Sequence, residues 1–299
     1  MNNQNTKLGT VIVTYNGEKH INKLLASLPS LENTIIVDND SKDKTTKIAE
    51  KFGCKIIKNT KNLGYGAAVN QGLKSLKNKY THFLILNQDT IIKSFDLTEK
   101  DLESSDIIQA QVLLPNGKIN VESLSMNIFG FIYPKNYNNF SIINSPKKLE
   151  FFSGSSFIIS QNVINDIGYF DESLFLYYED ADYSIRCLMK GKKMVLMPKF
   201  KVEHSYHNLI ESEDKKQFIY KNRKVIINRY FKDIWRKLLF IKKIKPDKYT
   251  LSKDDKNKFA STIKTHLLLG FFTTQLPLAT RIAVNTIMVP YSFFIKLFL

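Results

Sequence analysis

The sequence at positions 81–90 reads Thr81-His82-Phe83-Leu84-Ile85-Leu86-Asn87-Gln88-Asp89-Thr90. Its apolar run is typical of a strand that is buried on both faces. In open α/β sheets, ligands bind just beyond the carboxyl ends of such strands, so Asp89 is the first candidate site residue. Its carboxylate would suit a divalent cation held against a diphosphate, because hard cations bind carboxylate and phosphate oxygens. On this motif alone, an ordinary turn formed by Asn87 and Asp89 is the better interpretation.

Three further strands are predicted before this one, at residues 8–13, 34–37 and 54–57, and helices alternate with them. The first helix is expected from the apolar periodicity that begins at Ile21, and Pro29 ends it. Ser41 is the expected N-cap of the second helix, and the third helix follows Gly64. This alternation indicates a parallel sheet covered by helices. Right-handed crossovers would bring four polar clusters to one edge of that sheet, at residues 14–16, 38–41, 62–64 and 87–89.

A dinucleotide-binding fold would show the same alternation of strands and helices. However, the first turn, Thr14-Tyr15-Asn16-Gly17, lacks the Gly-x-Gly-x-x-Gly pattern that cradles a pyrophosphate in that fold. A cation that neutralises the phosphates therefore fits this sequence better.

The second half of the chain contributes two more candidate clusters. A small turn around Gly154 and Ser155 lies between apolar runs, where the backbone can approach a ligand closely. Glu179, Asp180 and Asp182 fall in the first turn of a helix expected to end near Gly191, and one of them could act as a general base. Acidic first turns are also common for purely structural reasons. His204 follows a strand expected at residues 193–197 and becomes a metal candidate only if the fold places it beside Asp89.

Composition sets the broad class of the protein. With 299 residues, 43% hydrophobic and 24% charged, the chain is long enough for one large globular domain with additions. The two cysteines form no zinc or disulfide pattern, and no signal segment is expected at the N-terminus, so we expect a reducing cytosol. Residues 115–148 are rich in Asn and Pro and are expected to form a long excursion whose structure the sequence does not define.

The net charge of +16 is concentrated near the C-terminus, where residues 211–299 hold 19 of the 44 Lys and Arg but 7 of the 28 Asp and Glu. We expect a basic amphipathic helix at residues 218–231, a basic stretch at 235–248 and an apolar tail at 267–299 that Pro277 and Pro290 interrupt. No uninterrupted segment clearly reaches the roughly twenty residues of a membrane-spanning helix. We favour helices lying on an anionic membrane surface. A helical hairpin packed on the preceding globular domain or on a second subunit is the alternative, which leaves a homo-oligomer open.

These motifs, in this order between about Leu8 and Phe231, resemble the family 2 inverting glycosyltransferases, particularly the rhamnosyltransferase-like branch that builds bacterial surface polysaccharides such as capsule and cell wall. The ordered set carries the resemblance, and no single motif does. It implies a GT-A fold, a nucleotide-diphosphate sugar as donor and a saccharide or lipid-linked acceptor. The family's metal motif is often Asp-x-Asp, whereas Asn87 stands at its first position here, which removes one charge from the site.

The resemblance also implies roles for individual residues. Asp180 would be the catalytic base, and Asp89 with His204 would hold Mn²⁺ or Mg²⁺. The acceptor would meet Gly154, Ser155, Glu179 and Asp182. The nucleotide sugar would contact the edge of the sheet through Thr14, Tyr15, Asn16, Asp38, Asn39, Asn62, Gly64, Asn87, Gln88 and Asp89.

We therefore predict a GT-A catalytic domain at residues 1–210, with a nucleotide-binding half at 8–114 and an acceptor-binding half at 115–210, followed by a C-terminal region at 211–299. The protein is expected in the cytoplasm, peripheral on the inner face of the plasma membrane. A nucleotidyltransferase is disfavoured because the first loop is neither glycine-rich nor basic. A nucleic-acid binder is disfavoured because the basic residues accompany a strongly apolar tail and not exposed aromatic side chains on which bases could stack. A catalytically inactive, membrane-docked nucleotide-binding scaffold remains the alternative function.

Overall fold

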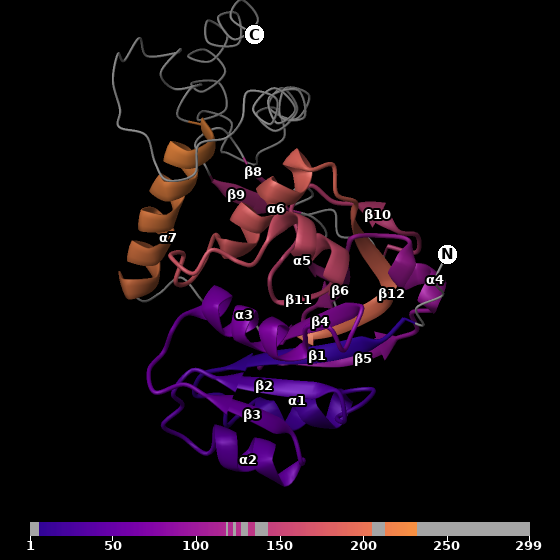
Figure 1. Cartoon of the computed structure of the whole chain (residues 1–299), viewed down its shortest axis with the longest axis vertical. Helices are drawn as coiled ribbons and strands as arrows, with labels where there is room; N and C mark the ends of the chain where they lie inside the picture. The colour runs from indigo at the N-terminus through magenta and orange to yellow at the C-terminus, as the bar shows by residue number, and fades with distance from the viewer. Residues whose placement is uncertain are drawn as a thin grey trace, which may run out of the picture.

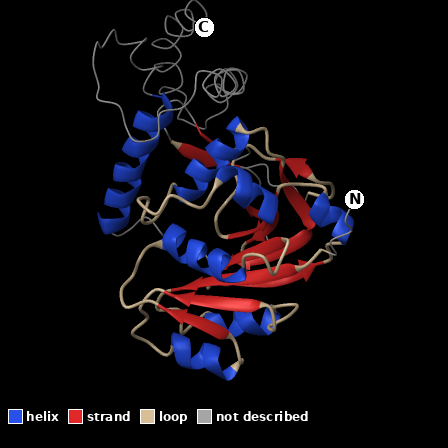
Figure 2. Cartoon of the chain, viewed as in Figure 1, coloured by secondary structure: helices blue, strands red, loops and turns tan. Residues whose placement is uncertain are grey.

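The computed structural model describes residues 6–117, 119–121, 124–126, 131–134, 143–204 and 213–231, and helices flank a central sheet in it (Figure 1, Figure 2). The first half alternates as predicted, in the order β1 Leu8–Thr14, α1 Ile21–Ser27, β2 Thr34–Asp38, α2 Thr45–Lys51, β3 Lys55–Lys58, α3 Tyr65–Leu76 and β4 His82–Asn87. Strand β1 pairs in parallel with both β2 and β4, and β2 pairs in parallel with β3. The carboxyl ends of these strands therefore share one edge of the sheet, as the sequence indicated.

The second half extends the same sheet. Its elements are β5 Thr90–Phe95, α4 Glu99–Glu103, β6 Ile107–Leu113, β7 Ile119–Val121, β8 Leu124–Met126, β9 Ile132–Pro134, β10 Lys147–Lys148, β11 Ser156–Ser160, α5 Gln161–Ile167, α6 Glu179–Met189, β12 Met194–His204, α7 Glu213–Ile226 and the π-helical turn η1 Ile227–Phe231. The strand order is β10-β12-β6-β11-β4-β1-β2-β3, with β5 paired to β12 and β7 to β6, while β8 and β9 form a separate pair. Strand β11 runs antiparallel to both β4 and β6, which makes the sheet mixed.

The core lies in two layers because alternate side chains of each strand point to opposite faces of the sheet. Val11, Phe83 and Phe157 belong to the layer that α3, α5 and α6 cover, whereas Ile12 and Leu84 belong to the layer beneath α1, α2 and α4. The fully buried apolar runs of β1 and β4 therefore reflect strands sandwiched between helices.

Three sequence expectations need correction or extension. Ser41 does not cap α2, whose N-cap is Lys44, because the Ser41 side chain bonds instead to Asp38. The strand expected at residues 193–197 is longer and extends to His204 itself. The described parts of residues 115–148 include the short strands β7 to β10. Both cysteines are free and buried.

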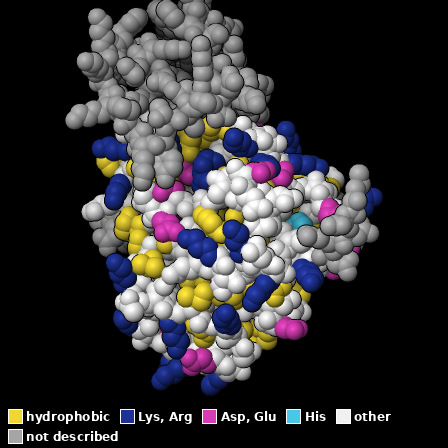
Figure 3. Space-filling model, viewed as in Figure 1, with side chains coloured by type: hydrophobic (Ala, Val, Ile, Leu, Met, Phe, Trp, Pro, Cys, Tyr) yellow, Lys and Arg dark blue, Asp and Glu magenta, His cyan; other side chains and the backbone are white. Residues whose placement is uncertain are grey.

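The expected basic helix is present as α7 and η1, and it packs on α6 through Ile226, Tyr230 and Phe231. The basic stretch and apolar tail at residues 235–299 lie outside the described residues. Among the residues that are described, no helix combines the length and the apolar character needed to cross a bilayer. On the face drawn in Figure 3, Lys and Arg side chains are spread over the described surface and are not gathered into one patch.

Candidate active site

The parallel register brings the first two polar clusters together. Thr14 and Asp38 are direct partners at the ends of β1 and β2, and the Thr14 hydroxyl donates to Asp38 Oδ1 at 2.9 Å. Ser41 donates to the same carboxylate twice, from its hydroxyl to Oδ1 at 2.5 Å and from its backbone N–H to Oδ2 at 3.0 Å. The carboxylate of Asp38 is thus held in one orientation, with acceptor capacity left on Oδ2 for an N–H of a ligand.

Asn39 and Asn62 shape the neighbouring loop before α3. Asn39 Nδ2 donates to the carbonyl of Gly64 at 3.1 Å, and Asn62 Oδ1 accepts from the backbone N–H of Gly64 at 2.9 Å. Gly64 has a φ of 89°, and a Cβ there would come within 2.3 Å of the Phe175 carbonyl oxygen. Only glycine therefore allows this loop to approach the chain just before α6.

Gln88, directly after β4, holds the turn that follows β1. Gln88 accepts from the backbone N–H of Tyr15 at 2.8 Å and donates to its carbonyl at 2.9 Å, while the Tyr15 side chain stays 47% exposed. Asn16 has a φ of 51°, and its Oδ1 accepts from the backbone N–H of Lys42 at 2.8 Å. Gln88 and Asn16 therefore hold the loop, whereas the Tyr15 ring is left exposed to solvent.

Asp89 and His204 meet even though 115 residues separate them. Strand β12 pairs with β5 so that His204 lies opposite Thr90, and His204 Nε2 comes within 3.1 Å of Asp89 Oδ1. Burial raises the pKa of Asp89, but the hydrogen bond and charge of His204 outweigh that effect, so the pKa lies below its usual range. Asp89 is therefore ionised in this site.

This pair fits a divalent cation. An anionic oxygen and an imidazole nitrogen approach one point, and nearby Asn87 Oδ1 is buried without a hydrogen-bond partner. Within the described residues, no cluster of three or more His, Cys, Asp or Glu side chains suits a metal ion. Oxygens of a bound diphosphate would have to complete the coordination, as is usual for Mg²⁺ sites built on one or two carboxylates.

Asp180 lies at the start of α6, directly opposite the small turn. Its Oδ2 accepts from the backbone N–H of Gly154 at 2.9 Å, and its Oδ1 accepts from the N–H of Ala181 at 2.8 Å. Burial raises the pKa of Asp180, and these hydrogen bonds oppose that effect without cancelling it. A partly exposed carboxylate with a raised pKa, fixed by backbone donors, has the properties of a general base.

Glu179 is buried beside it, with Oε2 unpartnered. Burial, and then the negative charge of Asp180, raise the pKa of Glu179 well above its usual range. Two carboxylates this close do not both ionise readily, and the larger upward shift at the more deeply buried Glu179 favours Asp180 as the one that carries the charge.

Tyr65 is a site residue that the sequence did not single out. Its hydroxyl donates to the Gly154 carbonyl, so Gly154 is bound by α3 on one side and by Asp180 on the other. Burial, and then the neighbouring carboxyl groups of Glu179, Asp180 and Asp89, raise the pKa of Tyr65 well above its usual range, so the phenol stays protonated. The signal that could have found it is its position directly after Gly64, at the first residue of α3.

Ser155 and Asp182 occupy different environments from Asp180. The Ser155 hydroxyl is 3.2 Å from the hydroxyl of Ser153 in the buried turn. Asp182 has no exposed surface, and Arg186, Arg229 and Tyr230 bind its carboxylate at 2.8, 2.6 and 2.6 Å. The expectation that Asp182 meets the acceptor therefore fails in this structure, because a buried carboxylate with every oxygen occupied has no free surface to offer.

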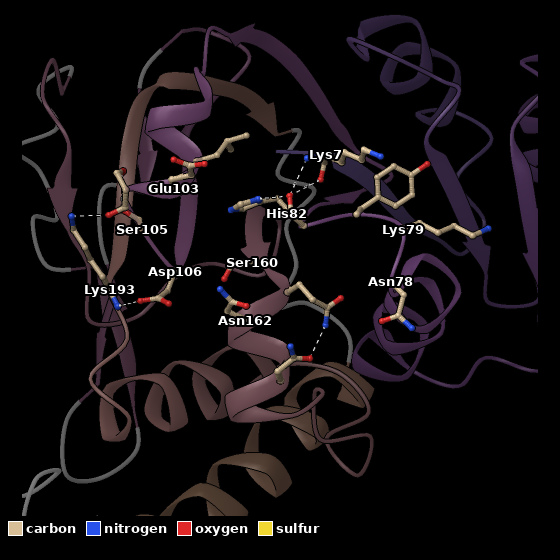
Figure 4. Close-up of a pocket in the computed structure, with 16 residues that line it drawn as sticks. Lys7, Asn78, Lys79, His82, Glu103, Ser105, Asp106, Ser160, Asn162 and Lys193 are labelled. Carbon is tan, nitrogen blue, oxygen red and sulfur yellow. Dashed lines mark hydrogen bonds between the residues drawn. The ribbon is translucent and has the colours of Figure 1, made fainter. Parts of the chain in front are cut away.

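A hollow of about 1090 Å³ lies at the opposite edge of the sheet, where β4 begins (Figure 4). His82, Glu103, Asp106, Ser160 and Lys193 line it. Because Asp89 and Asp180 lie beyond the other end of β4 and β11, this hollow is separate from the cluster described above.

Residues 10–168 match the family model described as glycosyl transferase family 2. The chain belongs to glycosyl transferase family 2. Among curated relatives of this family 2 glycosyltransferase, the hexosyltransferase Agl10 of low-salt glycan biosynthesis from Haloferax volcanii is 23% identical over 67% of each chain. The N-acetylglucosaminyl-diphospho-decaprenol L-rhamnosyltransferase of Mycobacterium tuberculosis is 24% identical over 66% of this chain and 75% of its own length. The dTDP-rhamnosyl transferase RfbF of Shigella flexneri is 26% identical over 67% of this chain and 70% of its own.

A solved structure supports the fold of this glycosyltransferase. The crystal structure of GalNAc-T7 with UDP, GalNAc and Mn²⁺ aligns with a TM-score of 0.62 at 13% sequence identity, over 93% of this chain and 59% of that chain. The expected GT-A fold is confirmed, with a mixed, mostly parallel central sheet and flanking helices.

Proposed function

We propose that this family 2 glycosyltransferase moves a hexose from a nucleotide-diphosphate sugar to an acceptor hydroxyl with inversion at the anomeric carbon, using Asp180 as general base. The observation that carries the proposal is the placement of Asp180. Its carboxylate is fixed by the Gly154 N–H, has a raised pKa, and stands at the same sheet edge as Asp89 and His204.

The chemistry is a single displacement. Asp180 takes the proton of the acceptor hydroxyl while that oxygen forms a bond to the anomeric carbon. The bond from the anomeric carbon to the diphosphate oxygen breaks at the same time, and its electron pair leaves with the nucleoside diphosphate. Configuration inverts because the acceptor attacks from the face opposite the leaving group.

The remaining site residues would bind and orient the donor. Asp38 would accept an N–H of the base, and the exposed Tyr15 ring would pack against the nucleoside. Asp89 and His204 would hold Mn²⁺ or Mg²⁺, and a divalent cation bound there would supply positive charge against the diphosphate. The neutral Glu179 would face the acceptor side without opposing the charge of Asp180.

The names of the relatives guide the choice of substrates. Two of the three act as rhamnosyltransferases by name, one with a dTDP-linked donor and one on a lipid diphosphate. We therefore propose rhamnose as the first sugar to test and a lipid-linked saccharide as the first acceptor, within surface polysaccharide synthesis. Such an acceptor would place the enzyme at the inner face of the plasma membrane, and the basic C-terminal region is the proposed contact.

The test is the release of nucleoside diphosphate from a panel of dTDP- and UDP-sugars with lipid-linked acceptors, with Mn²⁺, with Mg²⁺ and with EDTA. Metal-dependent release from one donor supports the proposal. Asp180→Asn should lower turnover about a hundredfold to ten-thousandfold while the donor still binds, because a general base contributes that much. Asp166→Asn, the same change on a half-exposed surface carboxylate, is the matched control.

The alternative is an inactive nucleotide-binding scaffold. Donor binding by calorimetry without release from any donor of the panel would favour the scaffold and refute the transfer reaction. Retained turnover in Asp180→Asn would refute the role of Asp180 while leaving the transfer itself in place.

A further inference from the structure

Helix α7 and turn η1 lie against the chain segment that leads into the proposed catalytic base. This leading segment, Phe175–Tyr178, passes beside Gly64 and ends at Tyr178, the N-cap of α6. Asp180 follows two residues later. Any shift of the leading segment therefore moves Asp180 relative to the Gly154 N–H that holds it.

The leading segment ends in a strained turn. Tyr177 and Tyr178 have φ values of 67° and 71°, a left-handed conformation that bulky residues rarely adopt. Such a turn persists only where surrounding contacts determine it, and strain of this kind is typical of functional sites.

Asn222 of α7 supplies those contacts. Its side chain is 1% exposed, and its Nδ2 donates to the carbonyl of Leu176 at 2.9 Å and to the carbonyl of Tyr177 at 2.8 Å. These are the two carbonyls next to the left-handed residues, and one amide group uses both of its hydrogens on them.

Two other contacts fix the same segment. Phe218, one turn before Asn222 on α7, stacks on Phe175 with ring centroids 5.0 Å apart. The Phe175 carbonyl accepts from the backbone N–H of Tyr65 at 2.9 Å. The leading segment is therefore held between α7 and the start of α3, which also carries the hydroxyl bound to Gly154.

We propose that Asn222 is a positioning residue for the transfer reaction, which holds the left-handed turn so that Asp180 stays against the Gly154 N–H. The inference rests on the proposed function of Asp180 and assigns a catalytic consequence to a helix of the C-terminal region. Nothing in the sequence of that basic helix indicated a connection to the site.

The test compares Asn222→Leu with Gln217→Leu, which makes the same change of an amide to an apolar side chain at an exposed position of α7. We expect kcat of Asn222→Leu to fall about a hundredfold, the cost of displacing a catalytic group by about 1 Å. The donor KM should stay within about twofold, because the nucleotide-binding residues lie on other elements. Gln217→Leu should keep both constants.

The pH dependence of kcat distinguishes the loss of positioning from a general loosening of the fold, which would not shift it. The groups that face Asp180 and its turn are Glu179 and Tyr178 beside it, Tyr65 on α3, Asp89 after β4 and Arg223 on α7. The Gly154 N–H lowers the pKa of Asp180 against the effect of burial. Losing that bond should move the acidic limb of the kcat profile to higher pH in Asn222→Leu.

A rescue variant separates positioning from folding. Tyr177→Gly removes the cost of the left-handed conformation, so the double variant Tyr177→Gly/Asn222→Leu should regain at least tenfold in kcat over Asn222→Leu alone. If Asn222→Leu does not fold by circular dichroism, Asn222→Ser, which keeps one hydroxyl donor, replaces it, with an expected intermediate kcat.

The outcomes distinguish the proposed transfer reaction from the positioning role of Asn222. A wild-type enzyme without turnover refutes the proposed function itself. A wild-type enzyme that turns over, with folded Asn222 variants that keep its kcat and acidic limb, overturns the positioning role alone, as does a double variant no faster than Asn222→Leu.

Discussion

Arg229 joins η1 to Asp182 on α6 and to Asp171, and its replacement by Met should strongly destabilise the fold. Its guanidinium donates to Asp182 Oδ1 at 2.6 Å and to Asp171 Oδ2 at 2.7 Å. Asp182 has no exposed side-chain surface, and Arg229 and Asp171 are 7% and 12% exposed. Met fills a similar volume without the charge, so the Asp182 carboxylate would stay buried with one fewer partner.

The magnitude follows from what remains around Asp182. Breaking a buried ion pair by removing one partner costs about 3–5 kcal/mol, because the other charge is left uncompensated. Arg186 and Tyr230 still bind Asp182 at 2.8 and 2.6 Å, which favours the lower end of that range. We expect a loss of about 3 kcal/mol in the free energy of unfolding, with little dependence on salt because the groups are screened weakly.

Urea unfolding followed by circular dichroism measures this loss. The informative control is Asp182→Asn/Arg229→Met, which removes the stranded charge together with its partner, and a double-mutant cycle should show coupling of at least about 1 kcal/mol. A loss below about 0.5 kcal/mol in Arg229→Met, or strictly additive effects in the cycle, would refute the argument that this ion pair holds η1 on α6.

Two further predictions concern groups beside Asp180. Glu179 has its usual pKa of 4.5 in the unfolded chain and a raised pKa in the fold, so the folded protein binds more protons above pH 4.5. The free energy of unfolding should therefore fall as pH rises above 4.5, by up to about 1.4 kcal/mol per pH unit, until the raised pKa is reached. Glu179→Gln should reduce this slope in urea titrations at several pH values, leaving the smaller contribution of Asp180, and equal slopes in both proteins would contradict the raised pKa of Glu179. Tyr65→Phe should lower kcat up to about tenfold, since it removes one hydrogen bond to the Gly154 carbonyl. Tyr80→Phe loses a comparable bond to Asn33 and should keep its kcat in the same steady-state assay, so equal kcat values for the two variants would count against the Tyr65 contact.

The sequence determined the first half of the fold. Periodicity and polar strand ends were sufficient to predict β1 to β4 with their helices and one shared edge for Thr14, Asp38 and Asn87, because parallel crossovers leave little choice of arrangement. The same local signals placed Glu179 and Asp180 in the first turn of α6 and predicted a helix at residues 218–231. The domain boundary at residue 210 remains a prediction.

Only the tertiary structure decided which distant groups meet. The contact between Asp89 and His204 depends on the antiparallel pairing of β5 with β12, and the burial of Asp182 depends on η1 folding back onto α6. Asn222 reaches the leading segment for the same reason. Spacing along the chain carries no record of such long-range contacts, because they are set by which apolar faces pack together. That packing also gives each carboxylate its environment: Asp89 ionised beside His204, Asp182 paired with arginines, and Asp180 held by the Gly154 N–H with a raised pKa.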